Sequence, residues 1–189
     1  MIHRVHLPLV FRDYVAPADY PLLTEIYINP PNPQNSEETN KEWIEIYHPG
    51  DETVDLAGWT IGDALTHGDY GDGRYAFPGD ARLMPKQVLV VAACANEFSA
   101  RYGRNPDFEW TNCSATVPNL TPTGSWDGFG IALGNTQDEV VLQNATNDLV
   151  DSVAWGGHNR AGVTPFTDFE DYISTNSSLE RTPAHTDRD

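Results

Sequence analysis

The feature that most limits the fold of this chain is a series of short runs that alternate apolar and polar residues. The run 42–48, EWIEIYH, places Ile44 and Ile46 on one face and Trp43 and Tyr47 on the other, which is the two-residue period of a β-strand. Proline and glycine follow directly in HPGDE and end the run in a turn. Runs this short favour a protein built mainly from strands.

Similar runs, separated by turn residues, continue along the chain. The expected strands lie within 22–29, 42–48, 53–63, 74–77, 81–84, 87–93, 138–144, 148–156 and 177–181. The short polar turn ATN predicts that 138–144 and 148–156 form a hairpin. One short helix is expected at 96–102, ended by Gly103. About seven to nine short strands with one short helix predict an all-β sandwich.

We expect Ile44, Ile46, Leu56 and Trp59 to lie in the core of this sandwich. A chain of 189 residues suits one domain. We assign 1–20 to an N-terminal tail or linker, 21–182 to the sandwich, and 183–189 to a C-terminal tail that we expect to be truncated. Both ends resemble cuts in a longer protein, so neighbouring domains are expected.

Charge excludes several classes of partner. The chain has 28 acidic and 11 basic residues, a net charge of −17, which repels phosphate backbones and anionic lipid. We therefore expect no nucleic-acid partner. No apolar run approaches the length needed to cross a bilayer, so no membrane span is predicted either.

The two cysteines, Cys94 and Cys113, leave two alternatives open. Two cysteines are few enough to be free thiols in a reducing compartment. They are also an even number, as expected for a disulfide in an oxidising compartment. A disulfide between them would raise the free energy of unfolding by about 3 kcal/mol, because it restricts the unfolded chain.

Motifs of the common enzyme chemistries are missing from the sequence. GSWDG, residues 124–128, is not a nucleophile elbow, because its serine follows the first glycine directly. No phosphate-binding loop or dinucleotide fingerprint occurs. The histidines are too dispersed for a zinc site. We therefore predict that the chain is not an enzyme.

The loop GDALTHGDYGDG is the strongest candidate for a metal site. Asp63, Asp69 and Asp72 are separated by glycines, so their carboxylates could converge on calcium together with backbone carbonyls. The spacing is not that of an EF-hand. The alternative is a solvated hairpin loop whose Asp-Gly pairs form turns.

Aromatic side chains outside the predicted core are candidates for a ligand surface. Trp43 and Tyr47 share a strand face, and Trp126 lies near a predicted loop, as do Trp110 and Trp155. Exposed rings of this kind bind sugars and protein partners. The alternative is a strand buried on both faces near the centre of the sandwich.

Five segments taken in order resemble the lamin tail domain family. They are LLTEIYINPP, KEWIEIYHPGDETVDLAGWTIGD, RYAFPGDARLMPKQVLVVA, LGNTQDEVVLQNATNDLVDSVAWG and SSLER. The resemblance covers roughly residues 21–181. Within the family, the sequence is similar to the bacterial, secreted branch. The resemblance implies an immunoglobulin-like sandwich and gives no catalytic residues to carry over.

From this resemblance we expect a non-catalytic interaction or anchoring module of an exported bacterial protein. Its expected location is secreted or at the cell surface, and its expected partner is a protein, a polysaccharide or another surface component. The alternative is an accessory domain that assists an attached hydrolase, such as a nuclease or phosphatase, and is stabilised by calcium. Fold alone does not decide between them.

Overall fold

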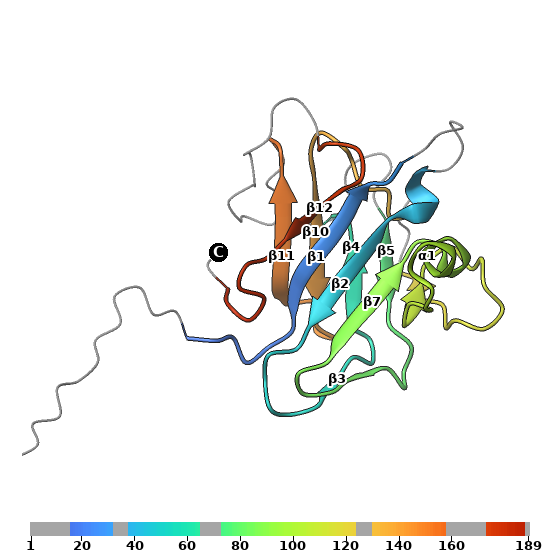
Figure 1. Ribbon diagram of the computed structural model, residues 1–189. Helices are drawn as coiled ribbons and strands as arrows, with labels where there is room; N and C mark the ends of the chain where they lie inside the picture. Colours follow the sequence, from blue (N-terminus) through green and yellow to red (C-terminus); the bar gives the residue numbers. More distant parts are fainter. Residues whose placement is uncertain (1–15, 32–37, 65–72, 124–129, 158–172, 188–189) are drawn as a thin grey trace, which may run out of the picture.

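The computed structural model describes residues 16–31, 38–64, 73–123, 130–157 and 173–187. These residues form 12 strands, which make two five-stranded sheets and one two-stranded ribbon. The two larger sheets pack face to face as a sandwich, with the short helix α1 at one side (Figure 1). The predicted all-β sandwich, immunoglobulin-like in fold, is therefore confirmed.

The first sheet has the order β12-β1-β2-β7-β8. Its strands are β12 (Ser177–Glu180), β1 (Leu22–Asn29), β2 (Trp43–Tyr47), β7 (Val88–Ala92) and β8 (Phe108–Glu109). Neighbours pair antiparallel except β7 and β8, which are parallel. The alternation along β2 turns Ile44 and Ile46 toward the second sheet and leaves Trp43 on the outer face.

The second sheet has the order β11-β10-β4-β5-β9. Its strands are β11 (Leu149–Trp155), β10 (Asp138–Gln143), β4 (Thr60–Gly62), β5 (Arg74–Ala76) and β9 (Thr121–Pro122). The ribbon pairs β3 (Val54–Asp55) with β6 (Arg82–Leu83). The predicted hairpin is present as β10 and β11, and Asn147 in its turn has a φ of 65°, a conformation that asparagine tolerates well.

The core lies between the two sheets. Ile44, Ile46 and Leu56 are completely buried there, as expected. Trp59 is only partly buried and packs at the margin of the core. The central indole belongs instead to Trp155 at the end of β11, which has no exposed surface and donates its Nε1–H to the carbonyl of Gly134 at 2.7 Å.

A smaller apolar cluster covers the outer face of the first sheet. The helix α1 (Ala95–Tyr102) lies against this face and packs Phe98 onto Trp43 (Figure 1). The helix ends at Gly103, whose φ of 70° suits glycine at this position. A short 3-10 helix, η1 (Glu38–Lys41), precedes β2 and contacts α1. Among the described residues, no helix has the length and apolar character needed to cross a bilayer.

The segments assigned to the two tails contact each other where the structure describes them. The backbone N–H of Ala18 donates to the carbonyl of His185, and the hydroxyl of Tyr20 donates to Asp187 at 2.7 Å. This hydrogen bond to a carboxylate, helped by burial, raises the pKa of Tyr20 to about 12. Residues 183–187 therefore fold back onto the start of the domain.

Candidate binding groove beside helix α1

A groove of about 330 Å³ opens on the outer face of the first sheet and is here named the α1 groove. Strands β1 and β2 form its floor, α1 forms one wall, and residues of and next to β12 form the other side. Its lining residues are Glu25, Tyr27, Trp43, Glu45, Phe98, Arg101, Tyr102, Arg104, Asn176 and Ser178. The groove combines aromatic rings with charges of both signs.

Aromatic rings pack closely at the bottom of the α1 groove. Tyr27 and Trp43 stack with their centroids 5.7 Å apart, and the edges of Phe98 and Tyr102 meet Trp43 at 6.0 and 5.8 Å. The indole N–H of Trp43 donates to the Tyr102 hydroxyl at 3.0 Å. Trp43 is only 7% exposed, so its ring supports the groove and does not offer an open platform.

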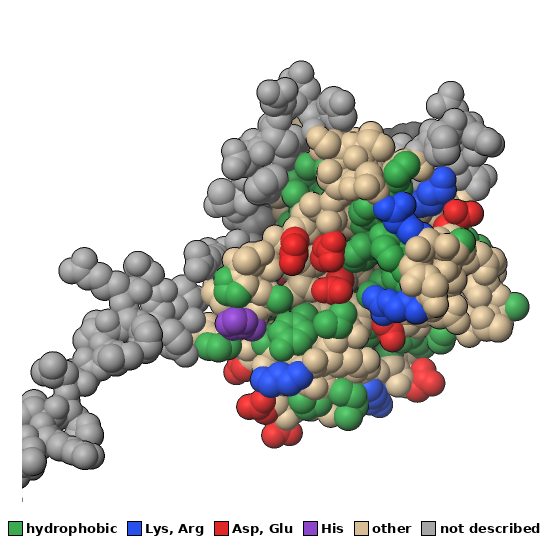
Figure 2. Space-filling view, viewed as in Figure 1, with side chains coloured by type: hydrophobic (Ala, Val, Ile, Leu, Met, Phe, Trp, Pro, Cys, Tyr) green, Lys and Arg blue, Asp and Glu red, His purple; other side chains and the backbone are tan. Residues whose placement is uncertain are grey.

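Three glutamates form a row across the neighbouring strands β12, β1 and β2. Glu25 is paired in register with Glu180 on one side and with Glu45 on the other. Figure 2 shows acidic side chains gathered at the centre of this face. Within the described ranges, the row has no ion pair with lysine or arginine. Like charges directly opposite each other on adjacent strands are destabilising.

Neutral hydroxyl groups hold two members of this glutamate row. Ser178 donates its hydroxyl to Glu25 at 2.7 Å, and Thr24 donates to Glu45 at 2.8 Å. The β1–β2 register shifts between Leu23 and Glu25, and this irregularity lets both Thr24 and Glu25 reach the outer face. Desolvation first, and the negative charge of Glu25 in addition, raise the pKa of Glu45, while the hydrogen bond from Thr24 and the positive charge of Arg104 act in the opposite direction.

We expect Glu45→Gln to stabilise the domain at neutral pH. A carboxyl whose pKa is raised by folding supports the fold below its unfolded pKa and loses that support as the pH rises through the folded pKa. Glutamine keeps the hydrogen bond with Thr24 and removes the charge. Because the side chain is half exposed and screened, the gain should be about 0.5 kcal/mol at pH 7 and should vanish near about pH 3.

Urea unfolding of wild type and variant at both pH values measures this gain. The matched control is Glu52→Gln, which removes one exposed charge outside the groove and should leave the free energy of unfolding nearly unchanged. Equal stability of Glu45→Gln and wild type at neutral pH would count against a strained glutamate row.

Two arginines, Arg101 in the last turn of α1 and Arg104 just after it, also line the groove. The guanidinium of Arg101 lies 5.1 Å from the centroid of the Tyr27 ring and 5.5 Å from that of Tyr102, and it also donates to Asn176 Oδ1. Arg104 lies 5.5 Å from the Phe98 ring. Rings at this site therefore already hold cations against their faces.

A second hollow of about 380 Å³ lies on the other side of α1, beside Pro30, Pro31 and Lys41. Phe98, Arg101 and Tyr102 line both hollows. Tyr102 is 40% exposed, so it forms a ridge between the two. The last turn of α1 thus presents its side chains to both hollows.

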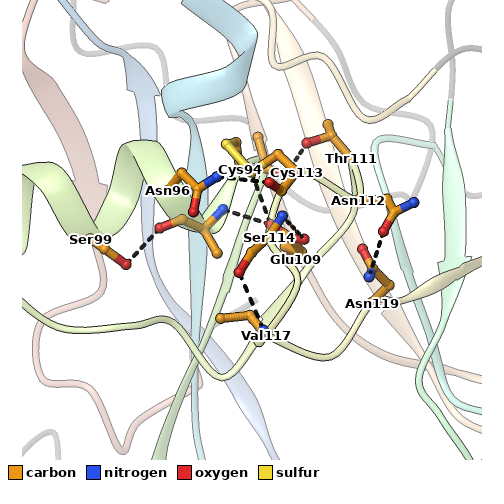
Figure 3. The surroundings of a disulfide bond; sticks show 12 residues. Cys94, Asn96, Ser99, Glu109, Thr111, Asn112, Cys113, Ser114, Val117 and Asn119 are labelled. Carbon is orange, nitrogen blue, oxygen red and sulfur yellow. Dashed lines mark hydrogen bonds between the residues drawn. A yellow bond between two sulfur atoms is a disulfide. The ribbon is translucent and has the colours of Figure 1, made fainter.

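A disulfide fixes the beginning of α1. The sulfurs of Cys94 and Cys113 are bonded at 2.05 Å, which joins the residue before the helix to the loop after β8 (Figure 3). The fully buried Glu109 lies beside them and accepts the backbone N–H groups of Ala95 and Ser114, each at 2.7 Å. Cys94 makes no side-chain cap, so the carboxylate of Glu109 supplies one from another element.

Cys94, Cys113 and Glu109 are also close enough together to resemble a metal-ligand set. The two sulfurs are bonded to each other, however, and a disulfide sulfur is not the thiolate that metals take as a ligand. In this state the three residues serve to anchor α1.

Replacing both cysteines with alanine should lower the free energy of unfolding by about 3 kcal/mol, because the bond closes a loop with a sequence separation of 19. Urea denaturation measures the loss. Wild type treated with a phosphine reductant is the control and should approach the variant's stability. A difference between wild type and variant within error would show that the bond does little for the fold.

The predicted calcium ligands are only partly described. Asp63 is buried and accepts the backbone N–H of Gly73 at 2.5 Å and that of Ala132 at 2.9 Å. Its carboxylate thus ties together segments that are far apart in sequence. Asp69 and Asp72 lie outside the described residues, so calcium binding by this loop stays a prediction.

Only part of the predicted aromatic surface lies at the groove. Trp43 forms the floor, Tyr47 is half-buried and does not line it, and Trp126 lies outside the described residues. Sequence reasoning did not find Arg101 or Glu25. Helical spacing could have grouped Arg101 with Phe98, but the position of Glu25 beside Glu45 depends on strand pairing.

Comparisons with known proteins agree with this architecture. A DUF4876 family protein from Bacteroides thetaiotaomicron, whose crystal structure is known, is similar with a TM-score of 0.51 and 13% identity. The match covers 69% of this chain and 43% of that chain, so this chain spans less than half of that protein, and at this identity the likeness shows the fold alone. No curated protein sequence matches the chain.

Residues 16–157 match the family described as Lamin Tail Domain. This range includes the first sheet except β12, both cysteines and the whole second sheet. Since the match spans most of the 189 residues, the chain belongs to the lamin tail domain family.

Proposed function

We propose that this domain is a non-catalytic interaction module of an exported bacterial protein and that it contacts its partner through the α1 groove. The observation that carries the proposal is the hollow on the outer face of the first sheet, where charges of both signs meet aromatic rings. Concave sites that combine apolar rings with a few polar groups are typical binding sites.

The chemistry of the lining residues favours binding over catalysis. The α1 groove has no histidine or cysteine among its lining residues, and the base beside its serine, Ser178, is the carboxylate of Glu25, without a histidine to relay the proton. The arginines lie against aromatic rings. These groups can hold a charged ligand, whereas nucleophilic catalysis needs an activated nucleophile.

The disulfide supports export. Disulfides persist in oxidising environments such as the periplasm and the cell surface, and reducing compartments keep thiols free. A negatively charged surface also suits a protein that must remain soluble outside the cell. Membership of the lamin tail domain family is consistent with this role and does not identify the partner.

The test is binding of the fluorescently labelled domain to an array of defined oligosaccharides and synthetic peptides. We expect oligosaccharides or peptides of at least one chemical class to bind the wild-type domain. They should not bind Tyr102→Arg, because this substitution replaces the aromatic ring beside the groove with a longer charged side chain. Met84→Arg is the matched control, because Met84 is exposed and does not line the groove. Undiminished binding by Tyr102→Arg, or no binding by wild type, would contradict the proposal.

A further inference from the structure

We infer that the occupant of the α1 groove is an extended peptide segment that places a lysine or arginine side chain against Glu25 and Glu45. This inference rests on the proposed function and names the chemistry of the partner. Its basis is a row of carboxylates that, among the described residues, has no lysine or arginine at ion-pair distance, together with the apolar surface beside that row.

The first step in the argument is electrostatic. Glu25 faces Glu45 and Glu180 in register, and the protein partners described for Glu25 and Glu45 are neutral hydroxyls. Within the part of the chain that the structure describes, no lysine or arginine comes to ion-pair distance of the row, although the charge of Arg104 acts on Glu45 from farther away. An incoming cation relieves the repulsion between the carboxylates and gains charge-assisted hydrogen bonds to two of them.

The second step concerns the shape beside the glutamates. Lysine and arginine carry an apolar stem that packs on hydrophobic surface while the charged head reaches polar groups. In the α1 groove the partly exposed ring of Tyr102 offers this surface next to the carboxylates. Arg101 already lies across Tyr27 and Tyr102 in this manner, so the rings can hold a guanidinium.

The third step concerns the arginines that line the groove. Both are exposed; Arg101 is held by Asn176 and by two rings, and Arg104 lies against the Phe98 ring. An exposed guanidinium can bond to peptide carbonyls or to an acidic side chain of the same ligand. Acidic and basic groups in one groove therefore favour a peptide that carries both a cationic side chain and polar acceptors.

A neutral sugar fits these observations less well. Stacking of a sugar needs an open ring face, and Tyr27 and Trp43 are both more than nine-tenths buried. A sugar would also leave the charge of the glutamate row uncompensated. Oligosaccharide binding is therefore the alternative outcome of the test.

The experiment is an NMR titration of the ¹⁵N-labelled domain with a capped alanine pentapeptide that carries a central arginine. We expect saturable shifts of the Trp43 indole N–H and of the Glu25 and Glu45 amides. The same peptide with glutamine at the centre should bind at least roughly tenfold more weakly. Glu25→Gln combined with Glu45→Gln should weaken the arginine peptide by a similar factor.

The matched control is Glu52→Gln combined with Asp80→Asn, which makes the same change in net charge at exposed positions outside the groove. This variant should bind the arginine peptide like wild type. The spectrum of each variant also reports whether it is folded.

Equal binding of the two peptides, or no saturable shift at millimolar peptide, would overturn the inference. So would equal losses in the groove variant and the charge-matched control. If an oligosaccharide on the array binds wild type and not Tyr102→Arg while the arginine peptide fails, the proposed function stands and the peptide inference falls.

Discussion

Replacing Trp155 with alanine should lower the free energy of unfolding by about 3–5 kcal/mol, a cost typical of deleting a large buried aromatic side chain. The ring is fully buried in the core between the two sheets, so the substitution leaves a cavity there. It also leaves the Gly134 carbonyl without the indole N–H that it accepts at 2.7 Å. Urea denaturation followed by far-ultraviolet circular dichroism measures the loss.

Trp59→Ala is the matched control for this experiment. Trp59 is partly buried at the margin of the same core, so its truncation removes fewer contacts and should cost clearly less. Similar losses for the two substitutions would contradict the assignment of Trp155 as the central indole.

Asp151→Ala should also destabilise the domain by about 3 kcal/mol, because it breaks a buried ion pair and leaves the guanidinium of Arg181 with the less buried Asp187. The two carboxylate oxygens of Asp151 accept from Nη2 of Arg181 at 3.0 and 3.1 Å, and one of them also accepts the backbone N–H of Leu23 at 2.6 Å. The exposed fractions of the two side chains are only 12% for Arg181 and 2% for Asp151. Thermal and urea unfolding at neutral pH check the loss.

The matched control is Asp55→Ala, which removes the carboxylate from the exposed ion pair with Arg82 and should cost about 0–1 kcal/mol. Adding Arg181→Met to Asp151→Ala should recover part of the stability, since the double variant no longer buries a guanidinium that has lost its more buried carboxylate partner. Additive losses in the double variant would show that the pair itself contributes little.

Strand positions could be predicted where the alternation of apolar and polar residues extended over several residues. The run 22–29 coincides with β1, and the paired runs around ATN became β10 and β11, because their patterns and turn are local properties of the chain. Strands β8 and β9 were missed. Each has two residues, too few for a period, and their pairing depends on neighbours far away in sequence.

The choice between Trp59 and Trp155 shows where sequence reasoning ends. Both tryptophans stand beside a glycine at a strand boundary, and only the packing of one sheet on the other decides which ring becomes central. The glutamate row has the same origin. Glu25 and Glu45 are 20 positions apart, and an irregular register brings them opposite each other.

The cysteines could not be assigned from spacing, because whether they bond depends on the distance between their Cα atoms, which is 5.5 Å in the folded chain. Glu109 carried no sequence signal of its role as a cap for α1. Its carboxylate reaches Ala95 only after β8 has joined β7 in parallel.

The hydrogen bond between Ala18 and His185 holds the two ends of the described sandwich next to each other. Both stretches lie on the side of the sandwich away from α1 (Figure 1). A host protein could carry this sandwich as an insertion in one surface loop, because entry and exit are adjacent. In that arrangement α1 lies on the side of the sandwich away from both junctions.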